Sequence, residues 1–157
     1  MKIALFPGSF DPITLGHTDI INRMIPLFDK IIIGLGENSK KKYLFSTSQR
    51  KEWIEKIFSN EPKVEIQVYK NLTIHFCQEI GANYLIRGLR NASDFDYEKN
   101  IAQLNSAMAS EIESIFIIAR PELSHISSTI VREIISFKGD VSSFLPPSIT
   151  KDIKDHH

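Results

Sequence analysis

Side chains that bind phosphate groups follow several of the short apolar runs in this 157-residue chain. Arg87 and Arg90 flank a glycine where one run ends, three lysines at 40–42 follow a second run, and the hydroxyl residues at 127–129 follow a third. Arginine, lysine and hydroxyl groups donate hydrogen bonds to phosphate oxygens, and the charged donors form the stronger ones. These residue types favour an anionic, phosphate-bearing ligand.

The loop at 7–17, PGSFDPITLGH, carries a glycine, a hydroxyl at Ser9 and a histidine. It lacks the Lys-Ser/Thr ending of a P-loop and the spaced glycines of the dinucleotide-binding fingerprint. Thr14 fits the N-cap of a following helix, which places His17 near the third helical position. There its imidazole faces any anion bound by the free N–H groups of the first turn. Spacing alone leaves equally open that Thr14 only caps and that His17 is a surface residue.

The other groups also have structural interpretations. The lysines at 40–42 fit a solvated loop, the hydroxyl residues at 127–129 fit a helix cap, and the two arginines fit packing at a strand end. No acid follows the hydroxyl residues at capping-box spacing, which leaves backbone N–H groups for phosphate oxygens. Asp11 and Asp94 are interpreted as turn and cap residues and not as catalytic ones.

Apolar runs alternate with amphipathic segments along the chain, without a repeat or a linker. Continuous apolar runs predict buried strands, and the amphipathic segments predict helices. Ser46 and Gln49 are spaced as a capping box, and Gly81 and Gly139 fit helix C-termini. The expected strands are 2–6, 30–35, 64–69, 84–88 and 114–119, and the expected helices are 16–26, 47–58, 73–80, 94–109, 127–138 and one from about 147.

This order of elements predicts a single domain over 1–157 with an α/β, doubly wound, Rossmann-like fold and a five-stranded parallel sheet. Ligands of such folds bind in the crevice beyond the carboxyl ends of the strands. The cations, the hydroxyl residues and His17 all follow those ends, so we expect them to meet at one rim of the sheet.

Charge and composition indicate which kinds of partner the protein binds and in which cellular compartment it is expected. The 19 Lys and Arg residues balance the 19 Asp and Glu residues, and a formal net charge of zero disfavours a nucleic-acid-binding protein. Cys77 is the single cysteine and lies among apolar residues, which is typical of a core thiol in a reducing compartment. Pro7 and Gly8 interrupt the first apolar run, and no run approaches membrane-spanning length. We therefore expect a cytoplasmic protein without a signal peptide or membrane span.

Two motifs carry a resemblance to a known family. PGSFDPITLGH at 7–17 together with ISSTIVR at 126–132 resembles the nucleotidyltransferase superfamily that has a T/H-x-G-H motif and an S-x-T-x-x-R-like motif. Thr14, LIRGLR at 85–90 and DFDYE at 94–98 are similar to bacterial phosphopantetheine adenylyltransferases. The end motifs also occur in cytidylyltransferases and nicotinate-nucleotide adenylyltransferases, so LIRGLR is the more specific signal. The resemblance extends over 1–146.

The resemblance implies a role for residues that match the family motifs. His17 would bind the ATP phosphates and stabilise the transition state, and Ser9 and Phe10 would contact ATP, Ser9 also the acceptor phosphate. Lys41, Thr73 and Arg87 would bind phosphopantetheine. The remaining ATP-binding residues would be Gly88, Leu89, Arg90, Glu98, Leu123, Ser124, His125, Ile126, Ser127, Ser128 and Thr129. The chain departs from the family pattern at Ser9, Leu15, Thr73, Leu123 and His125.

The implied reaction joins an acceptor phosphate to the α-phosphorus of ATP and releases pyrophosphate. A phosphate monoester has a second pKa of about 6, so it is largely dianionic near neutral pH and needs no general base. The residues predict no dedicated metal cage, and Mg²⁺ would arrive bound to the ATP phosphates. The resemblance also implies a homo-oligomer, in particular a homohexamer.

Rival functions remain open at this stage. A different nucleotidyltransferase, acting on another acceptor, is the nearest alternative. A class I aminoacyl-tRNA synthetase has a related motif, but 157 residues leave no room for tRNA recognition. A non-catalytic nucleotide-sensing module would bind ATP without turnover and would tolerate loss of His17.

Overall fold

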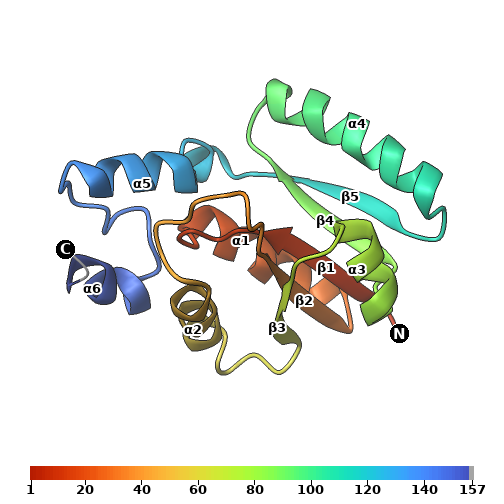
Figure 1. Ribbon diagram of the computed structural model, residues 1–157, viewed down its shortest axis with the longest axis horizontal. Helices are drawn as coiled ribbons and strands as arrows, with labels where there is room; N and C mark the ends of the chain where they lie inside the picture. Colours follow the sequence, from red (N-terminus) through yellow and green to blue (C-terminus); the bar gives the residue numbers. More distant parts are fainter. Residues whose placement is uncertain (156–157) are drawn as a thin grey trace.

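Five parallel strands form the centre of the computed structural model, which describes residues 1–155. The strand order is β3-β2-β1-β4-β5 (Figure 1). Their bounds are β1 Ile3–Gly8, β2 Lys30–Gly36, β3 Val64–Tyr69, β4 Tyr84–Leu89 and β5 Glu113–Ile118. The predicted doubly wound α/β fold with a five-stranded parallel sheet is confirmed.

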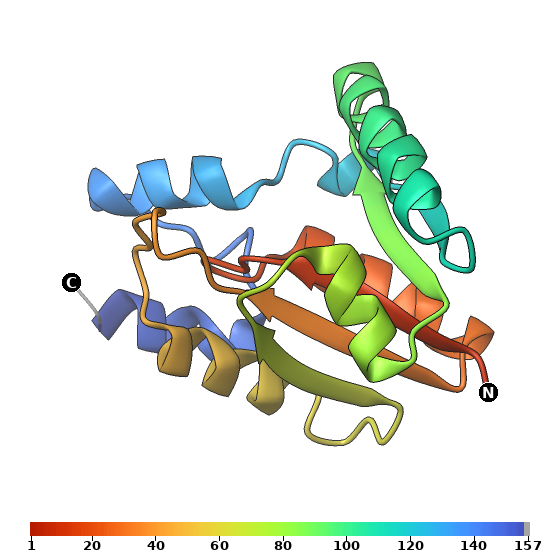
Figure 2. The same ribbon diagram turned by 45° about the vertical axis from the view of Figure 1, so that its right-hand side comes forward.

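Helices cover both faces of this sheet (Figures 1 and 2). The bounds are α1 Leu15–Met24, α2 Thr47–Ile57, α3 Thr73–Ile80, α4 Ala92–Met108, α5 Ser128–Ser136 and α6 Pro147–Asp155, with short 3₁₀ turns η1 Ile25–Leu27 and η2 Pro121–Leu123. The larger core joins one sheet face to α1, α2, α5 and α6, and a smaller core joins the other face to α3 and the end of α4. Among the described residues, no helix is long and apolar enough to cross a membrane.

The two cores explain why the inner strands are apolar throughout. Successive side chains of a strand point to opposite faces. In β1, Ala4 and Phe6 belong to the larger core, whereas Leu5 belongs to the smaller one. Since both faces are buried, the alternation of polar and apolar residues that marks a half-exposed strand is absent.

Several predicted boundaries need correction. β1 continues through Pro7 and Gly8, which were expected in a loop, because both residues pair with β2. Helix α5 ends at Ser136, and the left-handed residue beyond it is Lys138, with φ 58°, and not Gly139. The Gly139 N–H instead donates to the Ile134 carbonyl, an approach that the Ile134 side chain would block for a larger residue.

Other predicted helix ends are confirmed. Gly81 ends α3 in the left-handed conformation with φ 71°, as expected for a C-terminal glycine. The Ser46 side chain accepts a hydrogen bond from Gln49 N and so caps α2. Helix α4 begins at Ala92, two residues before the expected start, because Asn91 and not Asp94 is its N-cap.

The chain reverses its direction of travel across the sheet at β1, which lies between β2 and β4. In doubly wound folds the crevice at such a switch point holds the ligand, beyond the carboxyl ends of the strands. Figures 1 and 2 both show α5 and α6 on that side of the sheet and the N-terminus at the opposite end.

Candidate active site

Three cavities meet at the carboxyl end of β1. The His17 cavity, of about 260 Å³, is lined by His17, Arg90, Leu123, Ile126 and Ser127 among others. The α4 cavity, of about 370 Å³, is lined mainly by apolar residues of α4 with Leu72 and Thr73. The Lys41 cavity, of about 560 Å³, includes Ser9, Lys41 and Tyr43.

The residues that these cavities share lie at the end of β1, in β4 and at the start of α3, where Leu72 and Thr73 line both the α4 cavity and the Lys41 cavity. Pro7 and Arg87 line both the His17 cavity and the α4 cavity. Gly8 lines both the His17 cavity and the Lys41 cavity. A side chain at Gly8 would press against the Phe10 ring, with carbon atoms at 3.1 Å. The absence of a side chain at Gly8 therefore leaves room for the buried Phe10 ring, which packs against His17.

His17 is held at the start of α1 by a reciprocal cap. Thr14 is the N-cap, and its side chain accepts from His17 N at 3.4 Å. The Thr14 backbone N–H donates to Nδ1 of His17 at 3.0 Å. This contact requires an unprotonated Nδ1, so the proton of the neutral ring lies on Nε2. The predicted N-cap at Thr14 and the third helical position of His17 are both confirmed.

The surroundings of His17 keep its ring neutral. Burial, with the positive charges of Arg90 and Arg87 as smaller causes, lowers the pKa of His17 to about 4. The Phe10 ring packs edge-on against the imidazole, with centroids 5.0 Å apart. A neutral imidazole that accepts at Nδ1 can only donate at Nε2, so His17 offers one fixed donor to a ligand in its cavity.

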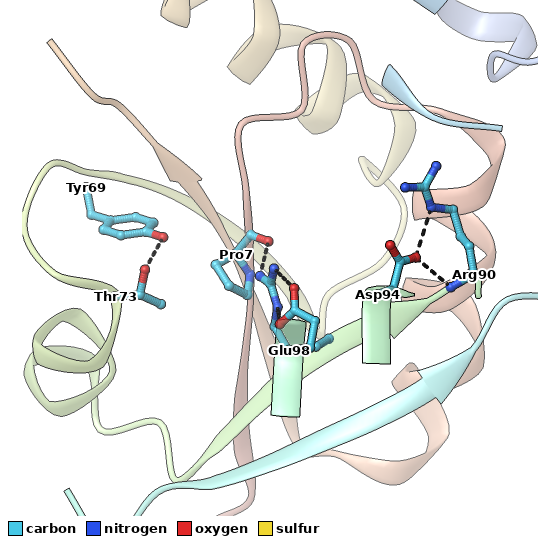
Figure 3. A network of polar contacts seen from close by, with 7 residues as sticks. Pro7, Tyr69, Thr73, Arg90, Asp94 and Glu98 are labelled. Carbon is cyan, nitrogen blue, oxygen red and sulfur yellow. Dashed lines mark hydrogen bonds and ion pairs between the residues drawn. The ribbon is translucent and has the colours of Figure 1, made fainter. Parts of the chain in front are cut away.

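Arg87 lies on the wall between two cavities and is paired with Glu98 of α4. Its Nε donates to Glu98 Oε2 at 2.8 Å and its Nη2 to Oε1 at 2.6 Å, while Nη1 lies 3.4 Å from the Pro7 carbonyl. Figure 3 shows Glu98 and Pro7 at this guanidinium group. A bidentate pair of this kind fixes the plane of the arginine.

Arg90 points into the His17 cavity from the residue after β4. Its backbone N–H and its Nε both donate to the same oxygen of Asp94, at 2.9 and 3.3 Å (Figure 3). Asp94 thus orients Arg90, and the expected cap role belongs to Asn91 instead. Among the described residues, the lining of the His17 cavity contains Arg87 and Arg90 and no carboxylate. The cavity therefore has the charge that suits an anion.

The segment expected to bind ATP at 123–129 is divided by the structure. Leu123, Ile126 and Ser127 line the His17 cavity. Ser127 also caps α5, because its hydroxyl accepts from Ile130 N at 3.2 Å. The two roles are compatible, because a residue that caps a helix lies beside the free N–H groups of its first turn, and those groups can bind an anion.

The other residues of that segment lie outside the cavity lining. The Ser124 hydroxyl donates to the Pro121 carbonyl at 2.9 Å, and that of Ser128 donates to the Pro12 carbonyl at 2.7 Å. His125 is exposed, with its ring 6.2 Å from that of Phe144. Thr129 is exposed and accepts from Arg132 at 3.2 Å.

Several other predicted residues take unexpected places. Phe10 is only 2% exposed, so its side chain supports His17 from the core and leaves only its backbone for a ligand. Glu98 lines the α4 cavity and not the His17 cavity. The hydroxyl of Thr73 is hydrogen bonded to that of Tyr69 at 2.9 Å, between the α4 and Lys41 cavities (Figure 3).

Gly88 lies beside α1, where a Cβ would collide with the Ile20 side chain. Both residues line the His17 cavity. Leu89 is buried behind them and is absent from the linings of the three cavities. The cavity surface at the end of β4 is therefore formed by Gly88 and Arg90, with Leu89 as core.

Three polar residues shape the site through contacts that the sequence did not indicate: Asp11, interpreted only as a turn residue, Arg132, known only as part of the motif at 126–132, and Arg50, which was given no role. The Asp11 carboxylate accepts from Leu44 N and Phe45 N at 2.8 and 2.9 Å, and Arg132 donates to the Asp11 carbonyl at 2.9 Å. Arg50 is 1% exposed and donates to the Ser9 carbonyl at 2.6 Å. A signal for Arg50 existed: it shares the apolar face of α2 with Trp53 and Ile54, at helical spacing.

Comparisons with known proteins place the chain in one family. The cytidylyltransferase-like family model matches residues 5–134. Proteins named phosphopantetheine adenylyltransferase are similar over nearly the whole chain. The one from Flavobacterium psychrophilum is 50% identical over 149 residues, with 95% of this chain and 98% of that protein covered. The one from Leuconostoc citreum is 46% identical over 156 residues, with 99% and 98% covered.

A solved structure shares the fold. It is a protein from Vibrio parahaemolyticus, provisionally named nicotinate-nucleotide adenylyltransferase, with a TM-score of 0.71 and 19% sequence identity. The match covers 98% of this chain and 99% of that one. At this identity the likeness supports the Rossmann-like architecture alone.

Proposed function

Since the chain belongs to the cytidylyltransferase-like family, and within it to the phosphopantetheine adenylyltransferases, we propose that it transfers the adenylyl group of ATP to 4′-phosphopantetheine. The products are dephospho-coenzyme A and pyrophosphate, a step of coenzyme A biosynthesis. One observation supports this function most directly. Three cavities adjoin at the end of β1, where His17 and Arg87 both line the His17 cavity.

The ATP molecule takes the His17 cavity. Its polyphosphate lies against Arg90, His17 and the first N–H groups of α1 and α5, which supply positive charge and donors. Its adenosine lies toward Leu123, Ile126 and Ser127, and these residues supply the apolar surface and the hydroxyl expected beside a nucleoside. The absence of carboxylates from the lining of the described cavity supports this choice.

The acceptor takes the two other cavities. Its phosphate lies near Ser9, Lys41 and Arg87, and its pantetheine arm passes Thr73 toward the apolar surface of α4. Arg87 supports this assignment because it reaches the junction from the α4 cavity. The phosphate of the acceptor and the α-phosphate of ATP then meet beside Gly8, where the cavities adjoin.

The reaction is an in-line displacement. An oxygen of the acceptor phosphate forms a bond to the α-phosphorus, the bond from that phosphorus to the bridging oxygen breaks, and pyrophosphate leaves with the electron pair. No proton is removed, because the acceptor with a second pKa of about 6 is already largely dianionic near neutral pH. The site has to align two anions and neutralise charge on the α-phosphoryl oxygens.

His17 supplies a donor at that position. The hydrogen bond from Thr14 N to Nδ1 supports a donor role, because a base would need the lone pair of Nε2, where the proton already lies. As charge accumulates on the α-phosphoryl oxygens, a preorganised donor gains strength, so His17 contributes mainly to the transition state.

Three further properties belong to the same proposal. Mg²⁺ enters bound to the ATP phosphates, which are the hard oxygen ligands that it prefers. The chain forms a homo-oligomer, and by its family a hexamer. The location is cytoplasmic, which fits Cys77 as a buried free thiol.

A panel of acceptors tests the function. Pyrophosphate release with ATP and Mg²⁺ is measured against phosphopantetheine, nicotinate mononucleotide and phosphocholine. We expect the highest kcat/KM for phosphopantetheine. Equal or faster turnover of nicotinate mononucleotide would reject this acceptor and keep the reaction class, and ATP binding without turnover of any acceptor would favour a sensing module.

A further inference from the structure

Arg50 is a fully buried cation whose donors serve the loops around the acceptor site. It is 1% exposed and lies on α2, outside the linings of the three cavities. Nε donates to the Phe45 carbonyl at 3.1 Å, Nη1 to the Ser9 carbonyl at 2.6 Å and Nη2 to the Thr47 hydroxyl at 3.1 Å. One planar group therefore joins the loop after β1 to the loop after β2.

The link to Ser9 is reinforced by Asp11. Arg50 and Ser9 are 41 positions apart in the sequence. The Asp11 carboxylate binds the backbone N–H groups of Leu44 and Phe45, and the latter residue also accepts from Arg50. The segment that carries Ser9 is thus held against residues 44–47 at two points, so neither loop can shift without the other.

The link to Lys41 passes through Tyr43. The guanidinium carbon of Arg50 lies 4.1 Å from the centroid of the Tyr43 ring. The Tyr43 hydroxyl accepts from Asn38 N at 2.8 Å, and Lys41 Nζ lies 5.6 Å from the same ring centroid. The Tyr43 ring thus contacts both Arg50 and the exposed loop that carries Lys41, so the position of Arg50 affects where Lys41 lies in the cavity.

Burial of a guanidinium group carries a desolvation cost, which lowers the pKa of Arg50 against the opposing effect of the Asp11 charge. A side chain that served only to fill the core would not require a charge. The fork matches three acceptors, two of them carbonyls from separate loops and the third the Thr47 hydroxyl at the start of α2, a geometry that a lysine cannot reproduce with one ammonium group.

We propose that Arg50 is a positioning residue for the acceptor phosphate, which aligns the Ser9 segment and the Lys41 loop without touching either substrate. The inference rests on the proposed function. Two of the residues that Arg50 contacts, Ser9 and Tyr43, line the Lys41 cavity, whereas the loop at 37–46 contributes nothing to the described lining of the His17 cavity. The effect therefore falls on the acceptor and not on ATP.

The test measures pyrophosphate release for Arg50→Lys, with KM determined separately for phosphopantetheine and ATP. Loss of alignment at the acceptor phosphate raises the phosphopantetheine KM roughly tenfold or more, with the ATP KM changed less than twofold. Lysine keeps the positive charge but not the planar fork. A wild-type phosphopantetheine KM in Arg50→Lys would therefore mean that charge alone matters, and it would overturn the proposal. Equal increases of both KM values, in parallel with a lower Tm, would show a merely structural role.

Two further variants keep the test decisive if Arg50→Lys folds poorly. Tyr43→Leu removes the ring that connects Arg50 to the Lys41 loop, and it should raise the phosphopantetheine KM in the same selective way. In the double variant the two increases of the phosphopantetheine KM should be less than additive, because both changes break the same contact between Arg50 and Tyr43. Fully additive increases would overturn the proposal. Arg23→Met is the matched control, since Arg23 also binds a backbone carbonyl, that of Ile118, but lines none of the three cavities.

Turnover by the wild-type enzyme distinguishes the proposed function from the proposed role of Arg50. Absence of phosphopantetheine turnover by wild type would reject the proposed function, and the role of Arg50 with it. Turnover by wild type with an unaltered phosphopantetheine KM in both Arg50→Lys and Tyr43→Leu rejects the role of Arg50 alone.

Discussion

Glu98, in the second turn of α4, binds Arg87, near the end of β4, through two hydrogen bonds of 2.6 and 2.8 Å. The glutamate side chain is 10% exposed and the arginine side chain 32%. The family resemblance assigns Glu98 to ATP, whereas this contact connects it to the arginine that faces the acceptor. The observed geometry therefore gives Glu98 a positioning role for Arg87.

Glu98→Gln tests this role. The variant leaves Arg87 without its charge partner in a partly buried position, so the free energy of unfolding should fall by about 1–3 kcal/mol. The KM for phosphopantetheine should rise more than that for ATP, because the plane of Arg87 is no longer fixed. Asp94→Asn is the matched control on the same helix. Its partner Arg90 is more exposed, at 39% of its side chain, so the stability loss should be smaller. A larger rise in the ATP KM for Glu98→Gln would return Glu98 to the nucleotide.

The two arginines of β4 and its end should divide between the substrates. Arg87 borders the α4 cavity as well as the His17 cavity, whereas Arg90 lines only the latter of these two. Arg87→Ala should raise the acceptor KM more than the ATP KM, and Arg90→Ala the reverse. Each lost charge-assisted contact to a largely desolvated phosphate corresponds to about 2–3 kcal/mol. Titration calorimetry that finds both ligands bound normally by both variants would place the site elsewhere.

Removal of the His17 donor should reduce the rate more than binding. Loss of one preorganised donor typically costs about 10²- to 10³-fold in kcat. His17→Ala should show a loss of that size, with the ATP dissociation constant changed far less and the fold retained. Near-wild-type kcat in this variant would reject the site assignment.

The pH–rate profile distinguishes a donor from a base. Because the pKa of His17 is lowered to about 4, its ring stays neutral across the range in which the acceptor phosphate loses its second proton, near pH 6. The acid limb should therefore come from the acceptor and remain unchanged in His17→Gln, which keeps a donor and partly restores kcat. An acid limb that disappears in the glutamine variant would establish a base.

The same lowered pKa predicts a stability difference in acid. The pKa of His17 is about 4 in the folded protein, against the ordinary histidine value of 6.5 in the unfolded chain. As the pH falls from 7 to 5, the unfolded chain takes up a proton that the folded protein does not, so wild type loses stability. His17→Gln lacks this loss. Urea denaturation should show a fall in unfolding free energy that is larger by about 1 kcal/mol for wild type than for His17→Gln, because solvent partly screens the half-buried ring. Equal falls in the two proteins would contradict the lowered pKa.

Features of this protein that depend on near neighbours followed from the sequence by itself. The alternation of strands and helices follows from residue periodicity, and with it the parallel doubly wound sheet. Thr14 and His17 are only three positions apart, so their spacing was sufficient to predict the N-cap at Thr14 and the third helical position of His17, although not the hydrogen bond from Thr14 N to the imidazole. The phosphate-binding character of the strand ends was equally visible, because the fold class alone brings those ends to one rim.

Contacts between distant segments were decided by the tertiary structure. Arg50 reaches Ser9 across 41 positions, and Asp11 reaches Phe45 across 34, and no local pattern specifies either contact. The burial of Phe10 and the division of the rim into three cavities also depend on how α2, α4 and α5 pack around the end of β1. The physical reason is that periodicity determines which face of an element is buried, whereas the partner of a buried polar group is selected only when separate elements are packed together.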